Sequence, residues 1–252
     1  MISTMQANPW IICPQARPSA RIRLFCFSYA GVGASAFRGW TGHLPSAIDV
    51  CFVQLPGREN RLRERPYTCM DDLIPSLATN MLPMLDRPYA FYGHSLGAFV
   101  AFETARQLRR SRNTHLRHFF AGASPAPQLS WEHSFLHPLN DKNFLDEIQS
   151  RYGGVPQQIL DDPEIRALLL PVMRADVTML ENYQYTSEPP LQCGVTVFGG
   201  QNDRMVMPHS LEAWRHQTEA NFRVEMLESG HLFTQPVPLG LLRSIAADLE
   251  VW

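Results

Sequence analysis

A serine set between two glycines is the first feature of this sequence that could do chemistry. The run 93–97 (GHSLG) follows the apolar run 89–92 and precedes a helix-like run that begins at Ala98. A strand that turns this sharply into a helix holds its serine clear of the sheet, and it leaves no room for side chains two positions before and after the serine. The pattern therefore predicts Ser95 as a nucleophile at a helix N-terminus, where backbone N–H groups face a developing oxyanion.

A serine hydroxyl needs an adjacent general base, which a third group orients. With this kind of turn the partners follow the serine in the order acid, then histidine. Asp203 comes directly after a strand-like run and two glycines, and it competes with Asn202, which carries no charge, and with Asp176, which lies in a predicted helix. His231 follows the last strand-like run and a glycine. We expect Ser95, Asp203 and His231 to form a catalytic triad at one edge of a parallel sheet.

The oxyanion that forms during such a reaction needs two N–H donors. Leu96, directly after the nucleophile, is expected to supply one. The loop at residues 28–33 follows the first clear strand, and its Ala30 or Tyr29 is expected to supply the other. Although this loop contains glycines, it fits neither GxxxxGK[ST] nor GxGxxG, so we do not expect nucleotide binding.

Short apolar runs that alternate with helical patterns must position these residues. Strand-like runs occupy residues 22–27, 50–54, 89–92, 118–121, 195–198 and 223–227. Helical patterns occupy residues 71–85, 96–109, 210–219 and 239–249. This alternation predicts an α/β fold with a mostly parallel central sheet that is flanked by helices.

Residues 124–194 interrupt the alternation. The segment begins with prolines and aromatic residues and continues with two helical patterns, at residues 141–152 and 163–183. We expect a single domain at residues 1–252, with 124–194 as a helical lid insertion that lies over the edge bearing Ser95 and shapes an acyl pocket. The alternative is a helical subdomain that only extends the core.

Composition narrows the class of protein. The formal net charge of −2 provides no field for nucleic acid, and no apolar run approaches the length of a membrane span. The five cysteines are scattered, and two of them, Cys26 and Cys51, lie in strand-like runs, which is typical of free thiols in a reducing compartment. The first residues show no signal-peptide pattern, so we expect a cytoplasmic protein.

His133 and His137 have the i, i+4 spacing of metal ligands, but no third ligand accompanies them. We therefore expect neither a metal site nor a bound cofactor. We also expect a monomer.

Six segments together resemble the type II thioesterases, which are stand-alone α/β hydrolases that accompany polyketide synthases and nonribosomal peptide synthetases. The segments are 25–31 (FCFSYAG), 36–40 (AFRGW), 54–61 (QLPGRENR), 93–97 (GHSLG), 199–203 (GGQND) and 230–233 (GHLF). The resemblance implies an α/β-hydrolase fold and the hydrolysis of acyl groups from the phosphopantetheine thiol of carrier proteins, through an acyl-serine intermediate. It also implies a triad of Ser95, Asp203 and His231, with oxyanion donors at Ala30 and Leu96.

Two departures from the family pattern stand out. Ser28 replaces a common proline and Val32 a common glycine, so the oxyanion loop is expected to differ in shape. Where the family often has two successive acids, this chain has Asn202 and then Asp203, which leaves one acid to orient His231. A product-releasing or cyclising thioesterase, a general carboxylesterase and a non-catalytic carrier-binding module are the alternative functions.

The arginines that follow the second strand-like run suggest where an acidic carrier protein binds. Arg58 and Arg61 lie inside the family motif and are expected to be structural. Arg63 and Arg65 lie beyond it and are expected to contact the carrier, although internal salt bridges with Glu59 and Glu64 are the alternative.

Overall fold

Seven strands form one sheet in the computed structural model, which describes residues 8–113, 115–130 and 133–250. The order is β1-β3-β2-β4-β5-β6-β7, and every neighbouring pair is parallel except β1 with β3. The strands are β1 (Ile11–Ile12), β2 (Ile22–Phe27), β3 (Ile48–Val53), β4 (Tyr89–His94), β5 (Leu116–Gly122), β6 (Gly194–Gly200) and β7 (Phe222–Leu227). The mostly parallel sheet confirms the prediction.

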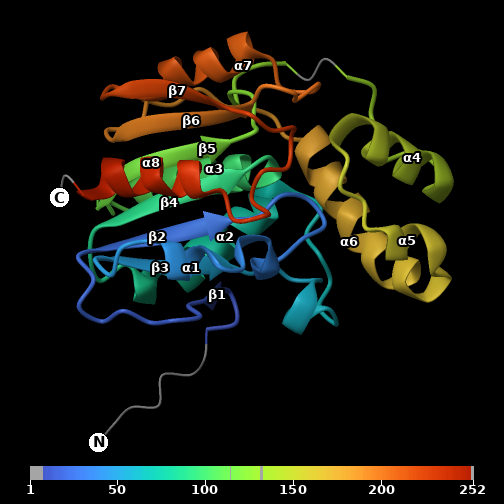
Figure 1. The fold of residues 1–252 in the computed structure, drawn as a ribbon, viewed down its shortest axis with the longest axis horizontal. Coiled ribbons are helices and arrows are strands. Elements are labelled where there is room, and N and C mark those ends of the chain that lie inside the picture. Colours follow the sequence, from blue (N-terminus) through green and yellow to red (C-terminus); the bar gives the residue numbers. More distant parts are fainter. Residues whose placement is uncertain (1–7, 114, 131–132, 251–252) are drawn as a thin grey trace, which may run out of the picture.

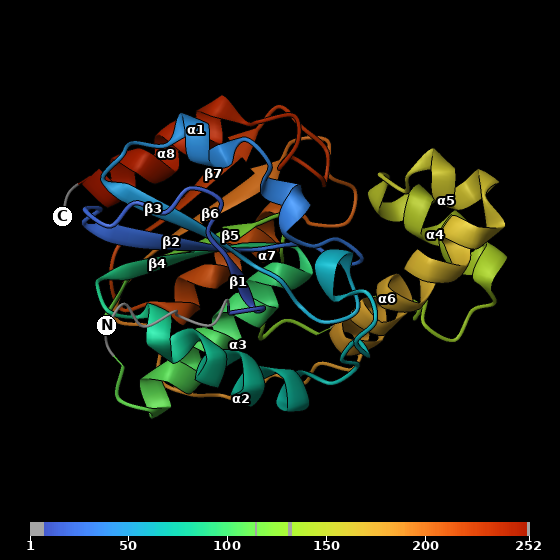
Figure 2. The same ribbon diagram turned by 90° about the horizontal axis from the view of Figure 1, so that it is seen from below.

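Helices cover both faces of this sheet (Figures 1 and 2). One face carries α1 (Trp40–His43) and α8 (Leu239–Glu250), and the other carries α2 (Met70–Met81), α3 (Leu96–Arg110) and α7 (Pro208–Glu212). Short 3₁₀ turns lie at Ala34–Phe37, Glu59–Arg61, Leu82–Met84 and Ala213–Gln217. The predicted helices at 71–85 and 210–219 therefore exist, but each ends as a 3₁₀ turn.

The period of two along each strand divides the core into two layers. Phe25 and Phe91 point to the face covered by α2 and α3, where they pack with Leu77. Leu24 and Tyr92, one position away, point to the face covered by α1 and α8. Because both faces are buried, the strands read as continuous apolar runs rather than alternating ones.

Three further helices lie beyond the carboxyl ends of the parallel strands (Figures 1 and 2). They are α4 (Asp141–Tyr152), α5 (Gln157–Asp161) and α6 (Pro163–Glu181), and we call them the α4–α6 segment. They share a small apolar cluster of their own, which includes Phe144, Ile159 and Val177. The helical pattern at 141–152 matches α4, and that at 163–183 matches α6 to within two residues, whereas α5 was not predicted.

The expectation of free thiols is wrong for two cysteines, because Cys13 and Cys51 form a disulfide. The pairing of β1 with β3 explains it: Ile12 lies opposite Phe52, so the next residue of each strand, Cys13 and Cys51, also face each other, with their Cα atoms 4.3 Å apart. A strand of two residues, β1, leaves almost no pattern in the sequence. Cys26, Cys69 and Cys193 are free.

Two features are absent from the described parts of the chain, a membrane-spanning helix and a group of metal ligands. No helix there is long and apolar enough to cross a bilayer. Nor do three His, Cys, Asp or Glu side chains gather there in a group that could hold a metal ion. Of the two histidines with ligand-like spacing, His137 bonds through Nδ1 to the Glu181 carboxylate at 2.6 Å.

Candidate active site

Ser95 occupies a strained turn between β4 and α3. Its backbone has φ 53° and ψ −118°, a conformation that residues other than glycine rarely adopt. A Cβ at Gly93 would lie 2.3 Å from the carbonyl oxygen of Gly97, and one at Gly97 would lie 2.2 Å from that of Phe27. The chain therefore needs glycine at both positions, for the steric reason that the motif predicts.

His231 and Asp203 lie in line with Ser95. The distance from His231 Nε2 to Ser95 Oγ is 3.0 Å, and that from His231 Nδ1 to Asp203 Oδ2 is 2.8 Å. The three residues follow β4, β6 and β7, so the carboxyl ends of three parallel strands bring them together. With its proton on Nδ1, His231 donates to Asp203 and leaves Nε2 to accept the serine proton.

The surroundings of Asp203 lower the pKa of its carboxyl group and so keep it ionised. Burial opposes its ionisation, but the hydrogen bond from His231 and the N–H groups of Met205 and Val206 outweigh that cost and hold its pKa below the ordinary value of an aspartate. Of the two competing residues, Asn202 carries no charge and is exposed beside it, and Asp176 lies in α6 and bonds to other residues. The structure thus places Asp203, and neither competitor, against His231.

His94 is a part of this site that the sequence analysis did not single out. Its buried imidazole lies between the hydroxyl of Tyr92, 3.1 Å from Nδ1, and the carbonyl oxygen of His231, 2.9 Å from Nε2. Burial, and secondarily the charge that His231 can carry, lower the pKa of His94 to about 3. A neutral ring accepts from Tyr92 and donates to the His231 carbonyl. His94 therefore holds the loop that carries His231. The only feature of the sequence that could have indicated this role is the position of His94 next to Ser95.

The two expected oxyanion donors border Ser95 from different elements. Leu96 is the first residue of α3, so no partner exists for its N–H inside the helix. Ala30 and Tyr29 belong to the loop after β2, and they line the same cavity as Ser95.

That loop, residues 28–34, is fixed by hydrogen bonds from outside and within. The hydroxyl of Ser28 donates to the carbonyl of Val32 at 2.6 Å, and the N–H of Ala34 donates to the side chain of Gln54 at 2.7 Å. Ser28, where the family commonly has proline, thus ties the loop to itself through a bond that proline cannot make.

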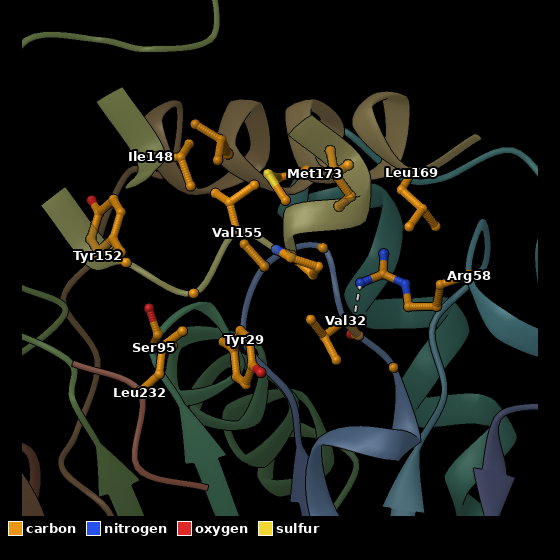
Figure 3. A pocket seen from close by; sticks show the side chains of 18 of the residues that line it. Tyr29, Val32, Arg58, Ser95, Ile148, Tyr152, Val155, Leu169, Met173 and Leu232 are labelled. Carbon is orange, nitrogen blue, oxygen red and sulfur yellow. Dashed lines mark hydrogen bonds between the residues drawn. The ribbon is translucent and has the colours of Figure 1, made fainter. Parts of the chain in front are cut away.

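Two cavities meet at Ser95 and His231. The first, of about 300 Å³, lies between the loop 28–34 and the α4–α6 segment, with Ile148, Leu169 and Met173 on the helical side (Figure 3). The second, of about 530 Å³, extends the other way and carries polar and basic groups such as those of Gln128, Arg204 and His209. The apolar cavity suits a hydrocarbon chain, and the polar one suits a hydrated or charged group.

The four arginines after β3 divide as the sequence predicts into two kinds. Arg58 and Arg61 are buried: Arg58 pairs with Asp176, and Arg61 pairs with Glu64 at 2.6 Å while its guanidinium lies over the ring of Trp10. Both guanidinium groups are thus buried and paired within the fold. Arg63 and Arg65 are exposed, and neither forms an ion pair with another residue in the described ranges.

Fold and site together define a hydrolase of the α/β-hydrolase class with a serine, histidine and aspartate in line. Comparison with known proteins gives the family, since residues 22–247 match the family described as thioesterase domain, and the chain belongs to this family. It is therefore an enzyme that hydrolyses thioesters, as the resemblance implies.

Several of its relatives come from biosynthetic pathways of natural products. The gramicidin S biosynthesis protein GrsT of Aneurinibacillus migulanus is 42% identical over 228 residues, which cover 90% of this chain and 89% of GrsT. The thioesterase RedJ from the prodiginine pathway of Streptomyces coelicolor is 36% identical, with a TM-score of 0.85 over 94% of this chain and 90% of that one. The type II thioesterase BorB from the borrelidin biosynthetic cluster is 28% identical, with a TM-score of 0.85 over 97% and 98% of the two chains.

Proposed function

We propose that this enzyme hydrolyses acyl groups from the phosphopantetheine thiol of carrier proteins that serve polyketide or nonribosomal peptide synthesis. Ser95 is the nucleophile, His231 the general base and Asp203 the group that orients it, while Ala30 and Leu96 donate to the oxyanion. The observation that carries the proposal is the line from Ser95 Oγ through His231 to Asp203, with steps of 3.0 and 2.8 Å, beside an apolar cavity.

In the first half of the reaction Ser95 Oγ attacks the thioester carbonyl, and Nε2 of His231 takes the hydroxyl proton. The carbonyl oxygen becomes an oxyanion between the two N–H donors, and Asp203 stabilises the imidazolium. The C–S bond then breaks, and the carrier thiol leaves with the proton that His231 returns. The product of this half is an ester of Ser95.

Water completes the reaction. His231 removes a proton from a water molecule, whose oxygen attacks the ester, and the tetrahedral intermediate collapses to a free carboxylic acid as Ser95 regains its proton. Side chains and water are sufficient for both halves, and phosphopantetheine arrives as part of the substrate. The proposal therefore requires no resident cofactor.

The two cavities suggest how the substrate lies. The apolar cavity takes the acyl chain, and the polar one, with Arg204 and His209, takes the phosphopantetheine arm. The single domain 1–252 then uses residues 124–194 as a lid, because the α4–α6 segment forms the outer wall of the acyl cavity. The enzyme works as a monomer, and the exposed Arg63 and Arg65 contact the acidic carrier protein.

The test is an intact-mass assay of an acyl-loaded carrier protein with the enzyme and with Ser95→Ala. Acyl-CoA and a nitrophenyl ester are measured alongside. We expect the carrier to return to its free-thiol mass faster than the small substrates turn over, and only when Ser95 is present. A carrier that stays loaded while the nitrophenyl ester is cleaved would show a general carboxylesterase instead.

The same experiment separates the remaining alternatives. Free acid as the product supports hydrolysis, and a cyclic product identifies a cyclising thioesterase, in which a group of the substrate replaces water. Binding of the carrier without turnover of any substrate would identify a non-catalytic module. Triad loss typically lowers kcat by about 10⁴- to 10⁶-fold, so activity that survives Ser95→Ala would dismiss Ser95 as the nucleophile.

A further inference from the structure

A buried ion pair joins the α4–α6 segment to the loop that carries the second oxyanion donor. Asp176 lies in α6, and its side chain is 1% exposed. Its two oxygens accept from Nη1 and Nη2 of Arg58, at 2.7 and 2.8 Å. The oxygen bonded to Nη1 also accepts the N–H of Gly31 at 2.7 Å. One carboxylate therefore holds an arginine from the loop after β3 and a backbone amide from the loop after β2.

The backbone around Gly31 allows this close approach. Gly31 has φ 79°, and a Cβ there would lie 3.3 Å from atoms of Met173, which stands one turn before Asp176 in α6. Glycine is thus favoured at this position by both conformation and space. Nη1 of Arg58 also lies 3.4 Å from the carbonyl oxygen of Val32 (Figure 3). Gly31 is therefore bonded to α6 directly, and Val32 only through Arg58.

Ala30 immediately precedes the amide that Asp176 binds. An oxyanion hole works because its donors point at the developing charge before the reaction begins, so the orientation of the Ala30 N–H matters as much as its presence. The bond from Gly31 to Asp176 fixes the peptide unit next to that N–H. Because the guanidinium bonds both carboxylate oxygens, Arg58 fixes the orientation of the carboxylate in turn.

We infer that Asp176 and Arg58 are positioning residues for catalysis, which couple the seating of α6 to the geometry of the oxyanion hole. This inference rests on the proposed function in that it takes Ala30 as a donor. It gives the α4–α6 segment a second task besides enclosing the acyl chain: when α6 is seated, the donor loop is in its working shape.

The test is Asp176→Asn, which keeps an oxygen for Gly31 but removes the charge that matches Arg58. Removal of one oxyanion donor costs about 10²- to 10³-fold in kcat, so we expect its misplacement to lower kcat about 10- to 100-fold. KM should change less than about threefold, because the acyl cavity keeps its lining. Turnover of a nitrophenyl ester is measured per site, with the number of folded sites counted by titration with a fluorophosphonate.

A boronic acid provides a readout that a purely structural role would not move. It forms a tetrahedral adduct with the serine and places an oxygen where the oxyanion lies, so its inhibition constant should rise by the same factor as kcat/KM falls. Arg58→Lys should act in the same direction, since an ammonium group cannot bond both carboxylate oxygens as a fork. The double variant should be no worse than the poorer single variant, as expected for two residues that act as a unit.

Asp141→Asn is the matched control. It makes the same change in another ion pair of α6, between Asp141 and Arg174 at 2.8 Å, where the carboxylate is exposed. We expect wild-type turnover and boronate affinity from it. The inference is overturned if Asp176→Asn keeps wild-type kcat per titrated site and wild-type boronate affinity, whatever its stability. If the enzyme does not hydrolyse the acyl-loaded carrier, but Asp176→Asn still lowers turnover of the ester, the proposed substrate is refuted and the inference stands.

Discussion

The two halves of the active site are built in different ways. Ser95, Asp203 and His231 stand at the ends of β4, β6 and β7, where the sheet determines the place of each residue. The opposite half, the α4–α6 segment, meets the rest of the site through buried polar contacts such as that of Asp176 with Arg58. The reacting atoms are thus placed by a continuous core, while the shape of the surrounding cavity depends on a few charged groups.

The buried carboxylates of Asp203 and Asp176 allow the two halves of the active site to be compared residue by residue. Both are almost wholly inaccessible, and each accepts hydrogen bonds from a cationic or ionisable side chain and from at least one backbone amide. Asp203 contacts the base itself, whereas Asp176 acts one peptide unit away from a donor. Loss of the first should therefore cost far more than loss of the second.

We expect Asp203→Asn to lower kcat about 10⁴-fold, because an amide cannot hold His231 in the tautomer that accepts the serine proton. The measurement is single-turnover hydrolysis of an acyl-loaded carrier. Asn202→Ala, one position away on an exposed side chain, should retain wild-type turnover. Equal losses from Asp203→Asn and Asp176→Asn would remove the distinction between the two halves.

The two halves should also differ in local stability. The α4–α6 segment has a small apolar cluster of its own, while β4 and β5 lie in the middle of the sheet between two larger apolar layers. Segments with fewer buried contacts open locally at a lower free-energy cost. Amide hydrogens of α4 and α5 should therefore exchange at least about 100-fold faster than those of β4 and β5. Hydrogen exchange followed by mass spectrometry checks this. Uniform protection would mean that the segment opens only with the whole domain.

The half of the site at the strand ends, formed by Ser95, Asp203 and His231, can be predicted from the sequence because each of its residues follows a local pattern. The motif at 93–97 predicts the turn at Ser95, and the acid and histidine follow strand-like runs within a few residues. The other half could not be predicted in the same way. Arg58 and Asp176 are 118 residues apart, and Gly31 and Asp176 are 145 apart. The residues near Asp176 in the sequence therefore do not indicate which groups it contacts. Sequence alone presents Asp176 only as a charge within a helix.

The same limit explains the cysteines. Cys51 lies in a clear strand-like run, but its partner Cys13 follows a strand of two residues that has no recognisable period. The role of His94 was missed for a related reason: its contact with the carbonyl of His231 spans 137 residues. What a residue touches across the fold is decided by the packing of whole elements, which local patterns do not encode.

His94 allows a test of the strand-end half by pH. Its folded-state pKa of about 3 lies below the ordinary value of 6.5, so between these values the unfolded chain binds a proton that the folded chain does not. Stability is therefore unaffected by His94 above pH 6.5 and falls as the pH drops below it. The loss is about 1.4 kcal/mol per pH unit, or about 2 kcal/mol at pH 5.

Urea unfolding of wild type and His94→Gln at pH 7.5 and pH 5 measures this difference. We expect the free energy of unfolding to fall by about 2 kcal/mol less in the variant, since glutamine has no proton to gain. His118, whose pKa burial lowers to about 4, acts in the same direction in both proteins and cancels in the comparison. An identical acid-induced loss in the two proteins would contradict a neutral, buried His94.

The smallest effect is expected at the surface, outside both halves. Arg63→Glu should raise KM for an acyl-loaded carrier protein about 3- to 10-fold, because an exposed charge contributes mainly to encounter with an acidic partner. KM for a small pantetheine thioester should be unchanged, since neither Arg63 nor Arg65 lines either cavity. Steady-state kinetics at two salt concentrations check both statements, and the difference should shrink at high salt.

Arg112→Glu is the matched control for this charge reversal. Arg112 is exposed too, but it follows the C-terminal end of α3, whose N-terminal end carries the nucleophile, so it lies at the opposite edge of the sheet. A helix of this length separates the two ends by about 20 Å, well beyond the screening length of about 8 Å in physiological salt. If both reversals raise KM for the carrier equally, the carrier responds to net charge, and the site of contact is not at Arg63. If only Arg63→Glu does, the carrier docks at the edge where the catalytic residues emerge.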